Sequence, residues 1–568
     1  MKAVARKQRK WIPSELDGSQ WSEIEEVINE LKKENIQSSE ALQIWLQKLG
    51  ELTDAIQEAG AIRFVKTRAN TADKEAEQEY MRFVQEVQPP LKEEYFQLTK
   101  LYLDHAKKFP LPGPYHLFHR SMENSYRLFH KENIPLDLKE LQLGQEYFKI
   151  RGQMTINWRG ETKTLEELEF FLEDPSREVR EDAWNAIQER RLKNREEIDR
   201  IFLELMKIRL QKAKNLGFSD YLEYRFLAME RFDYTPHDCR RLHQGMEKTV
   251  VPLVSKIFEK KQRDLGLTRL RPWDTLAPKG DEIPKAFSSG KELLEKGIEI
   301  FQSLDSQLAQ LALDMEEYEL LDLENRPHKA PGGFQMGLPE IGYPFIFMNA
   351  VGTISDLRTF FHEFGHAFHF LLARNQPLPF FRHSPMEFSE VASMTMELFT
   401  LPKWHLYFSK EQQKEVESSY FWHQIPQMLW YSTIDLFQLE IYSQELPSSQ
   451  KIRKIWQQTF SKLTPGVDWT GLEEFQENYW QKQLHLFQHP FYYIEYLLAR
   501  VGSLYIWLAF LEDERTAFQK YKEALSLGGT KPLPKLFEAA GAKLVFDEAD
   551  LKPLIGRLEK VLQEKGLL

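Results

Sequence analysis

The chain has 568 residues, of which 42% are hydrophobic and 28% charged, a composition typical of a soluble globular protein with room for several domains. Its formal net charge of −11 argues against a general nucleic-acid-binding protein, because such proteins present basic surfaces. The single cysteine, Cys239, excludes an internal disulfide framework and a cysteine-ligated zinc site. It lies in a polar run without a motif, which indicates a passive helix residue rather than a catalytic thiol.

No apolar segment follows the basic residues at the N-terminus, so no secretory signal is expected and the cytoplasm is the predicted location. The most apolar stretch, residues 491–511, is long enough to raise the question of a membrane span. Because Glu495 and Arg500 interrupt it, we expect a buried helix and no membrane association.

Apolar residues recur at helical spacing over residues 14–110, and we expect two or three long helices that pack as a bundle. Around residues 147–164 the period changes to alternation, and Gly152 and Gly160 supply turns, so a β-hairpin is predicted there. Helical spacing then resumes at Leu165.

Residues 328–349 contain four glycines and three prolines and cannot form a helix interior. Their last five residues, 345–349, predict a short strand. Thr353 and Asp356 then form a predicted capping box, and apolar residues at helical spacing continue the next helix as far as Asn375. Beyond Glu397 the pattern is helical to the end of the chain.

The helix that begins at this capping box contains the motif His362-Glu363-Phe364-Gly365-His366. Residues four apart lie on one helix face, so His362 and His366 can direct two imidazoles at one metal ion. Glu363 lies about 100° round the same turn, where it can reach a water on that metal as general base. The pattern therefore indicates a zinc hydrolase. The alternative is a buried, hydrogen-bonded histidine pair without metal.

A catalytic zinc site needs a third protein ligand and one open position. His369 would splay away from a metal held by the motif, and we assign it to packing or to support of the ligands. Residues 386–397 predict a second helix, on which Glu387, Glu390 and Glu397 lie near one face. Glu390 is the better candidate, although spacing alone does not choose among the three carboxylates.

The motif followed, 24 residues after His366, by Glu390-Val391-Ala392-Ser393 resembles the thimet oligopeptidase family of zinc endopeptidases, peptidase family M3. The likeness is specifically to its bacterial oligoendopeptidase F branch and covers residues 147–511 most clearly. Further segments resemble that branch in the same order: Gly217–Tyr221, Arg231–Tyr234, Arg271–Asp274, Pro344–Asn349 and His489–Tyr496.

The resemblance implies a mainly α fold, with two helical lobes around a deep substrate channel and a small β-sheet near the zinc site. We expect an N-terminal helical region over residues 1–145 and a helical region with the hairpin, part of the channel wall, over 146–340. The zinc catalytic region is expected over 341–568. These boundaries are approximate, and the lobes are expected to interleave.

The resemblance further implies one Zn²⁺ ion held by His362, His366 and Glu390, with Glu363 as the catalytic base. On this basis, we expect hydrolysis of internal bonds in short oligopeptides. One alternative is a metallocarboxypeptidase or dipeptidase on a similar helical scaffold. A zinc-stabilised peptide-binding protein without turnover is another, although a structural zinc has four ligands and no adjacent base.

The segment after His489 would face the zinc across the cleft in such a fold. His489, Tyr493 and Tyr496 would then donate to the oxyanion of the tetrahedral intermediate. The choice among these tyrosines and Tyr492, also a substrate-binding candidate, stays open. Oligomeric state and cleavage preference are equally open.

The predicted strand before the motif has a use in such a site. Its free edge can hydrogen-bond an extended peptide, which makes Phe347, Met348 and Asn349 candidates for substrate binding. The alternative is that this strand pairs within a hairpin.

Overall fold

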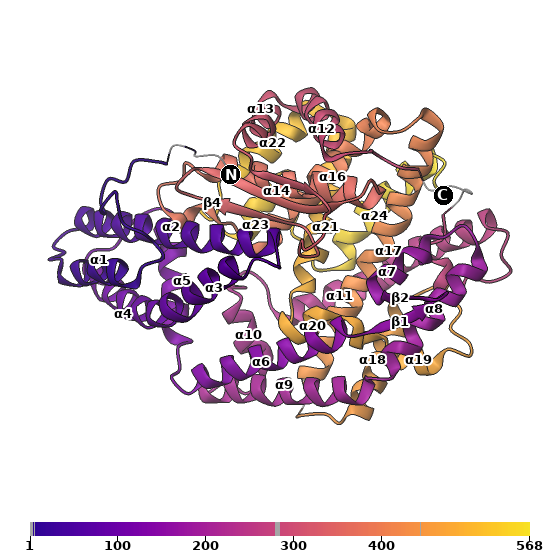
Figure 1. Cartoon of the computed structure of the whole chain (residues 1–568), viewed down its shortest axis with the longest axis horizontal. Coiled ribbons are helices and arrows are strands. Elements are labelled where there is room, and N and C mark those ends of the chain that lie inside the picture. Colours follow the sequence, from indigo (N-terminus) through magenta and orange to yellow (C-terminus); the bar gives the residue numbers. More distant parts are fainter. Residues whose placement is uncertain (1–3, 5, 279–283, 444) are drawn as a thin grey trace. The chain divides into compact units, whose positions relative to one another are not determined.

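The computed structural model describes residues 4, 6–278, 284–443 and 445–568. Figure 1 shows a chain built mostly of helices. The described residues also form one two-stranded and one three-stranded sheet, and the larger sheet packs against the helix that carries the metal motif. The predicted mainly α fold with a small sheet near that motif is therefore confirmed.

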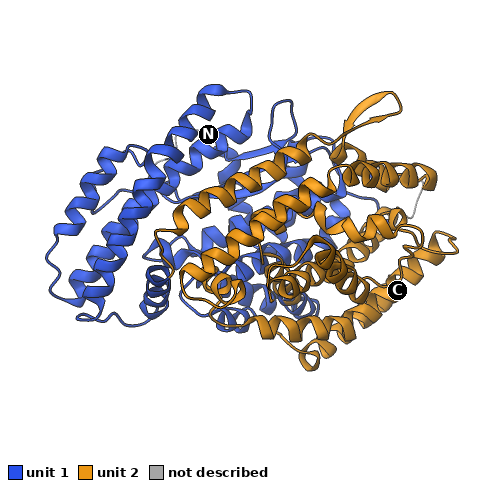
Figure 2. Cartoon of the chain, turned by 90° about the horizontal axis from the view of Figure 1, so that it is seen from below, with its two compact units in different colours: residues 1–127, 284–410, 502–544 blue, residues 128–283, 411–501, 545–568 orange. Residues whose placement is uncertain are grey.

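The chain divides into two compact units, each assembled from three separate stretches (Figure 2). Unit 1 comprises residues 1–127, 284–410 and 502–544. Unit 2 comprises residues 128–283, 411–501 and 545–568. Each unit takes in parts of all three regions set out from the sequence, so those regions are interleaved in the two units.

Unit 1 begins with the predicted bundle of long helices. Helices α1 (Trp21–Lys33), α2 (Ser39–Ala69) and α4 (Gln88–Ala106) turn their apolar faces to a shared core that includes the fully buried Trp45 and Leu46. The remaining elements of this part are α3 (Lys74–Arg82), a π-helical turn (Phe83–Val87) and α5 (Tyr115–Arg127).

The three-stranded sheet of unit 1 has the order β3-β5-β4. β5 (Tyr343–Ala350) confirms the predicted strand, and it pairs in parallel with β3 (Leu321–Glu324) and antiparallel with β4 (Phe334–Leu338). The expectation that β5 offers a free edge is therefore wrong. β5 is the middle strand, because β4 covers one of its edges and β3, which precedes β4 in the chain, covers the other.

The metal-motif helix of unit 1 lies between this sheet and a second helix. α14 (Ile354–Ala373) packs on β4 and β5 and also on α16 (Met386–Thr400), which confirms the second helix predicted over residues 386–397 (Figure 1). The other elements are α12 (Gly290–Leu304), α13 (Ser306–Glu317), α15 (Pro379–Arg382), a 3₁₀ segment (Leu401–Leu406), α22 (Glu514–Ser526) and α23 (Leu533–Ala539).

Unit 2 contains the predicted hairpin, formed by β1 (Thr155–Trp158) and β2 (Glu161–Thr164). The start of the alternating segment was placed too early, because residues 147–152 belong to α6 (Asn133–Gly152). Tyr147 explains why. Its ring is fully buried and stacks on Phe487 at 3.7 Å between centroids, so packing with a distant segment decides the conformation there.

Helices of different lengths and short 3₁₀ turns form the rest of unit 2. Among the long helices, α6 packs along α9 and α11 packs on α24. These elements are α7 (Leu165–Glu169), a 3₁₀ turn (Phe170–Glu173), α8 (Arg177–Leu192), α9 (Arg195–Asn215), α10 (Tyr221–Ala228), α11 (Pro236–Asp264), a 3₁₀ turn (Pro272–Asp274), α17 (Lys410–Tyr442), α18 (Ser449–Leu463), α19 (Glu473–Asn478), a 3₁₀ turn (Tyr479–Lys482), α20 (Leu484–Gln488) and α24 (Glu548–Glu564).

In the part of the chain that the structure describes, one helix is long and apolar enough to cross a membrane. This helix is α21 (Tyr493–Glu512), and 78% of its most apolar 18-residue stretch is buried inside the protein. Such burial is typical of the core helix of a soluble protein, so the predicted buried helix is confirmed.

Candidate active site

The start of α14 is fixed by the predicted capping box. The Thr353 hydroxyl accepts the Asp356 N–H at 3.0 Å. In return, the Asp356 carboxylate accepts the backbone N–H groups of Val351, Gly352 and Thr353 at 2.9 to 3.0 Å. This satisfies donors that a helix N-terminus leaves unpaired and ties the start of α14 to the end of β5.

Gly365, inside the motif, permits a very close approach of α14 and α16. A Cβ atom at this position would lie 2.6 Å from the Ser393 Cα and 2.8 Å from the Ala392 carbonyl oxygen. No larger side chain fits without separating the two helices. The glycine therefore sets the distance at which α16 presents its carboxylates to the motif histidines.

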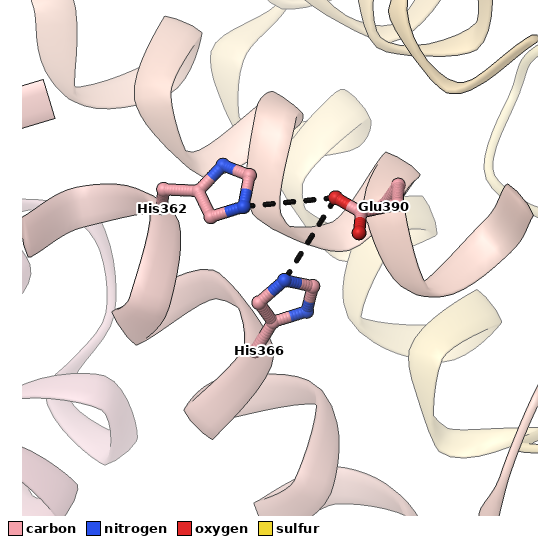
Figure 3. Close-up of side chains that lie close together, drawn as sticks. All are labelled: His362, His366 and Glu390. Carbon is pink, nitrogen blue, oxygen red and sulfur yellow. Dashed lines mark ion pairs between the residues drawn. The ribbon is translucent and has the colours of Figure 1, made fainter. Parts of the chain in front are cut away.

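This packing brings His362, His366 and Glu390 together (Figure 3). The Glu390 Oε2 lies 3.6 Å from the His362 Nε2 and 3.9 Å from the His366 Nε2. One potential ligand atom from each residue falls within 4.8 Å of the others. Glu390 is 5% exposed, so its carboxylate is held in a largely dry environment.

Glu397, an alternative candidate for the third ligand, lies on the other side of the His362 ring, at its Nδ1. Its Oε1 accepts a hydrogen bond from the His362 Nδ1 at 2.7 Å and lies 3.7 Å from the Arg358 guanidinium. Burial opposes protonation of His362, but the hydrogen bond and charge of the fully buried Glu397 outweigh it and raise the pKa of His362. A carboxylate in this position orients the imidazole so that its Nε2 faces Glu390.

We expect Glu397→Gln to weaken zinc binding by about 10- to 100-fold, the usual effect of losing an outer carboxylate partner of a ligating histidine. The amide keeps the size of the side chain but removes the charge that orients and polarises His362. Zinc titration against a chelating dye, at constant pH, measures the change. Unaltered affinity would show that Glu397 does not support the metal.

Glu363 projects from the same turn as His362 and is 6% exposed. Burial raises the pKa of its carboxyl to about 7, the charge of His362 opposes this, and the charge of Glu390 adds to it. The Gln335 backbone N–H, from β4, donates to the Glu363 carboxylate and lowers the pKa somewhat. A carboxyl group with a pKa near neutrality can both accept and release a proton at physiological pH.

His369 lies outside the three-residue cluster. It is 6% exposed, its Nε2 lies 3.4 Å from the Ser384 hydroxyl, and its ring meets Phe388 edge-on. Burial lowers the pKa of His369 to about 4 and that of His366 well below its usual value, so both imidazoles are neutral at pH 7. The surroundings of His369 are those expected of a packing residue.

The β5 residues expected to bind substrate are mostly enclosed. Phe347 is fully buried and stacks on Phe334, and Met348 is 1% exposed. Asn349 donates its side-chain amide to the carbonyl oxygens of Ala330 and Gly332, which lead into β4. A role of the three β5 residues in substrate binding stays a prediction. The free strand edge that motivated it is absent from β5, because both edges of this strand are paired.

The predicted oxyanion residues lie in unit 2, around α20 and the first turns of α21. His489 is exposed, Tyr492 and Tyr496 are half-buried, and Tyr493 is 8% exposed. The Gln483 side-chain amide donates to the Tyr493 hydroxyl. Tyr493 is thus the most enclosed of the three tyrosines.

The ring of His485, a residue that sequence reasoning missed, lies among these side chains. Its centroid is 4.9 Å from that of Tyr493, 5.7 Å from Tyr492 and 6.2 Å from Tyr496, and 6.0 Å from that of His489. Burial lowers the pKa of His485 to about 4, so the ring is neutral at pH 7. The feature of the sequence that could have identified His485 is its position about one helical turn before His489.

The fold and the site together define a mainly helical protein in which an H-E-x-x-H helix and a glutamate from α16 converge as a metal-ligand set. The model of peptidase family M3 matches residues 170–554, and the chain therefore belongs to this family. The family recognised from the sequence is confirmed, and the oligoendopeptidase F relatives support that branch.

Two curated relatives and one solved structure illustrate the similarity. The chain is 28% identical over 149 residues to an oligoendopeptidase F homolog of Lactococcus lactis subsp. lactis (strain IL1403), covering 26% of this chain and 24% of the relative. It is 25% identical over 162 residues to oligopeptidase PepF of Bacillus subtilis (strain 168), covering 28% of this chain and 23% of the relative. These alignments thus span about a quarter of the curated relatives. The structure of PZ peptidase A with inhibitor 2 shares the fold at a TM-score of 0.86, with 24% identity and 96% of each chain covered.

Proposed function

We propose that this chain is a zinc-dependent endopeptidase that hydrolyses internal peptide bonds of short oligopeptides. The observation that carries the proposal is the convergence of His362, His366 and Glu390, with the buried Glu363 in the same helical turn, in a member of peptidase family M3. Cytoplasmic location belongs to the same proposal, and peptides are its expected partners.

The donor set fits zinc. Two imidazole nitrogens and one carboxylate oxygen are the protein ligands of one class of catalytic zinc site, which keeps its fourth position open. Neighbouring ligand atoms of a tetrahedral zinc lie about 3.4 Å apart, close to the 3.6 Å and 3.9 Å that separate the Glu390 Oε2 from the two imidazole nitrogens. The bond from His362 to Glu397 is the outer support that such sites usually have.

Zinc, when bound, would lower the pKa of a water molecule to about 7 and polarise the peptide carbonyl. Glu363 would take the proton of the attacking water on a carboxylate oxygen and deliver it to the leaving nitrogen. Burial raises the pKa of this carboxyl to about 7, which suits both transfers. Its hydrogen bond from the Gln335 backbone N–H holds the carboxylate against β4.

The substrate peptide would pair with β4 rather than with β5. Among the described strands, β4 has a partner on one side, and Gln335 on this strand reaches Glu363. An extended peptide bound along the outer edge of β4 would bring its backbone beside the base. This assignment replaces the β5 edge expected from the sequence.

The residues around His489 would supply the oxyanion donors, as the family resemblance implies. The side chains of His485 and Tyr496 are half-buried and their rings adjoin, and both are neutral donors of the kind that stabilises developing negative charge. We assign the role to this pair because Tyr493 is more enclosed. The corresponding role of His489 stays a prediction.

Cleavage of an internally quenched peptide with both ends blocked tests the proposal. We expect cleavage at an internal bond, loss of activity on removal of metal with a chelator, and recovery with one equivalent of zinc. An exopeptidase would leave the blocked peptide intact while trimming its unblocked form. A non-catalytic peptide-binding protein would leave the mass spectra of both peptides unchanged.

A further inference from the structure

The segment from Gln483 to Tyr496, which we call the His/Tyr arm, is held by arginines of unit 2. Helix α20 ends within the arm and leaves carbonyl groups without helical partners. The Arg209 guanidinium donates to the carbonyl oxygens of Leu486 and Phe487 at 2.9 and 2.7 Å. The arm is therefore fixed through its backbone from outside its own helices.

Two more arginines bind the turn that follows. The Arg225 Nε donates to the Pro490 carbonyl oxygen at 3.1 Å, and the Arg231 Nη2 donates to the Phe491 carbonyl oxygen. The Phe491 N–H donates in turn to the Gln438 side-chain oxygen at 2.8 Å. Both backbone groups of Phe491 are thus held by buried polar side chains of other segments.

Phe491 has a φ of 67°, in the left-handed region that bulky residues rarely adopt. Its fully buried ring packs against Tyr221, Phe226 and Tyr442. A strained backbone of this kind persists where its surroundings over-determine it, and such positions cluster at functional sites. The strain here lies at the turn that sets the direction of α21.

Arg231 joins this turn to the helix that follows. It forms an ion pair with Glu495 at 2.8 Å, and the two side chains are 0% and 3% exposed. Glu495 stands between Tyr493 and Tyr496 in the first turn of α21. A buried ion pair adds little to stability compared with an apolar pair of the same size, and in several proteins such pairs specify one geometry instead.

We propose that Arg231 is a positioning residue for the His/Tyr arm. Its guanidinium holds the left-handed turn at Phe491 and the carboxylate of Glu495 together, and so fixes where the Tyr496 hydroxyl points. This inference rests on the proposed role of the arm in stabilising the oxyanion. Because a displacement of about 1 Å in a catalytic group can cost about 100-fold in rate, the effect should fall on kcat.

Arg231→Met keeps most of the apolar stem and removes the donors and the charge. We expect kcat for the blocked peptide to fall by about 100-fold, with KM changed by less than about 3-fold. Arg231→Lys restores a cation and should recover part of the lost kcat. Kinetics are measured on full-length, zinc-loaded protein below the unfolding temperature of each variant.

Arg180→Met is the matched control. Arg180 is also a buried arginine of unit 2, 3% exposed, and it pairs with the fully buried Asp274 at 3.2 Å. Its other bonds go to the carbonyl oxygens of Trp273, Asp174 and Pro175, outside the arm. This variant should lose stability while keeping kcat within about 3-fold.

A double substitution separates positioning from a general loss of structure. If Arg231 acts through Tyr496, Arg231→Met should cost less than about 3-fold in kcat when Tyr496 is already Phe. A full 100-fold loss in that background would overturn the inference. If Arg231→Met does not fold, Glu495→Gln takes its place, with a smaller loss that must also disappear in the Tyr496→Phe background.

The arm variants alone show which proposal fails. If Tyr496→Phe and His485→Gln lower kcat but Arg231→Met does not, the inference is wrong and the function of the arm stands. If both arm variants keep full kcat, the oxyanion role is wrong and the inference falls with it. Cleavage by the unaltered protein, tested separately, decides whether the chain is a peptidase at all.

Discussion

Glu363→Gln should leave zinc bound and reduce peptide cleavage by at least about 1,000-fold, within the range attributed to general acid–base catalysis. The amide is nearly the same size and can still accept the Gln335 backbone N–H that the carboxylate accepts. It has no oxygen basic enough to take a proton from water. The measurement is kcat for the blocked, quenched peptide, alongside the zinc content of the same preparation.

Glu58→Gln provides the control for this result. Glu58 is, like Glu363, a buried carboxylate of unit 1, and it accepts the backbone N–H groups of Glu340 and Ile341 at 2.7 and 3.0 Å. Burial raises the pKa of Glu58, as it does that of Glu363. The control variant should keep kcat, and full activity of Glu363→Gln with zinc verified would remove the assigned base.

The helix of the metal motif was predictable because its determinants are local. Thr353 and Asp356 specify its first turn, and the spacing of His362 and His366 places two imidazoles on one face. All of this information lies within about four turns of one helix. The structure reproduces each of these features.

The third metal-ligand candidate was not predictable from spacing. Glu387, Glu390 and Glu397 share a helix face, and what separates them is the crossing of α14 and α16. Gly365 permits that close crossing, which puts Glu390 beside the imidazole Nε2 atoms and Glu397 beside the His362 Nδ1. In the sequence analysis, family resemblance supplied the choice.

The position of β5 in its sheet and the surroundings of His485 were missed for a related reason. β3 pairs with β5 in parallel, and a parallel partner is contributed by a separate stretch that local pattern does not reveal. His485 belongs to no motif, and its contacts with three tyrosines arise from the turn at Phe491. Local sequence specified the strand and the helices here, whereas long-range contacts specified the neighbours of β5 and of His485.

Glu390→Gln should lower the affinity for zinc by more than about 100-fold, beyond the range typical of an outer carboxylate. The neutral amide oxygen is a much weaker zinc ligand than the carboxylate, and two imidazoles alone do not complete the three-ligand set of a catalytic site. Peptide cleavage should be lost with the metal, and excess zinc should restore part of it. Metal content after dialysis and a competitive zinc titration measure the loss.

Glu387→Gln is the matched control, because Glu387 is a buried carboxylate, 4% exposed, one turn earlier on the same helix and outside the cluster of three ligand candidates. It should retain one equivalent of zinc. If Glu390→Gln kept that equivalent while Glu387→Gln lost it, Glu387 and not Glu390 would be the third metal ligand. The zinc affinities of these two variants therefore decide which carboxylate of α16 completes the metal site.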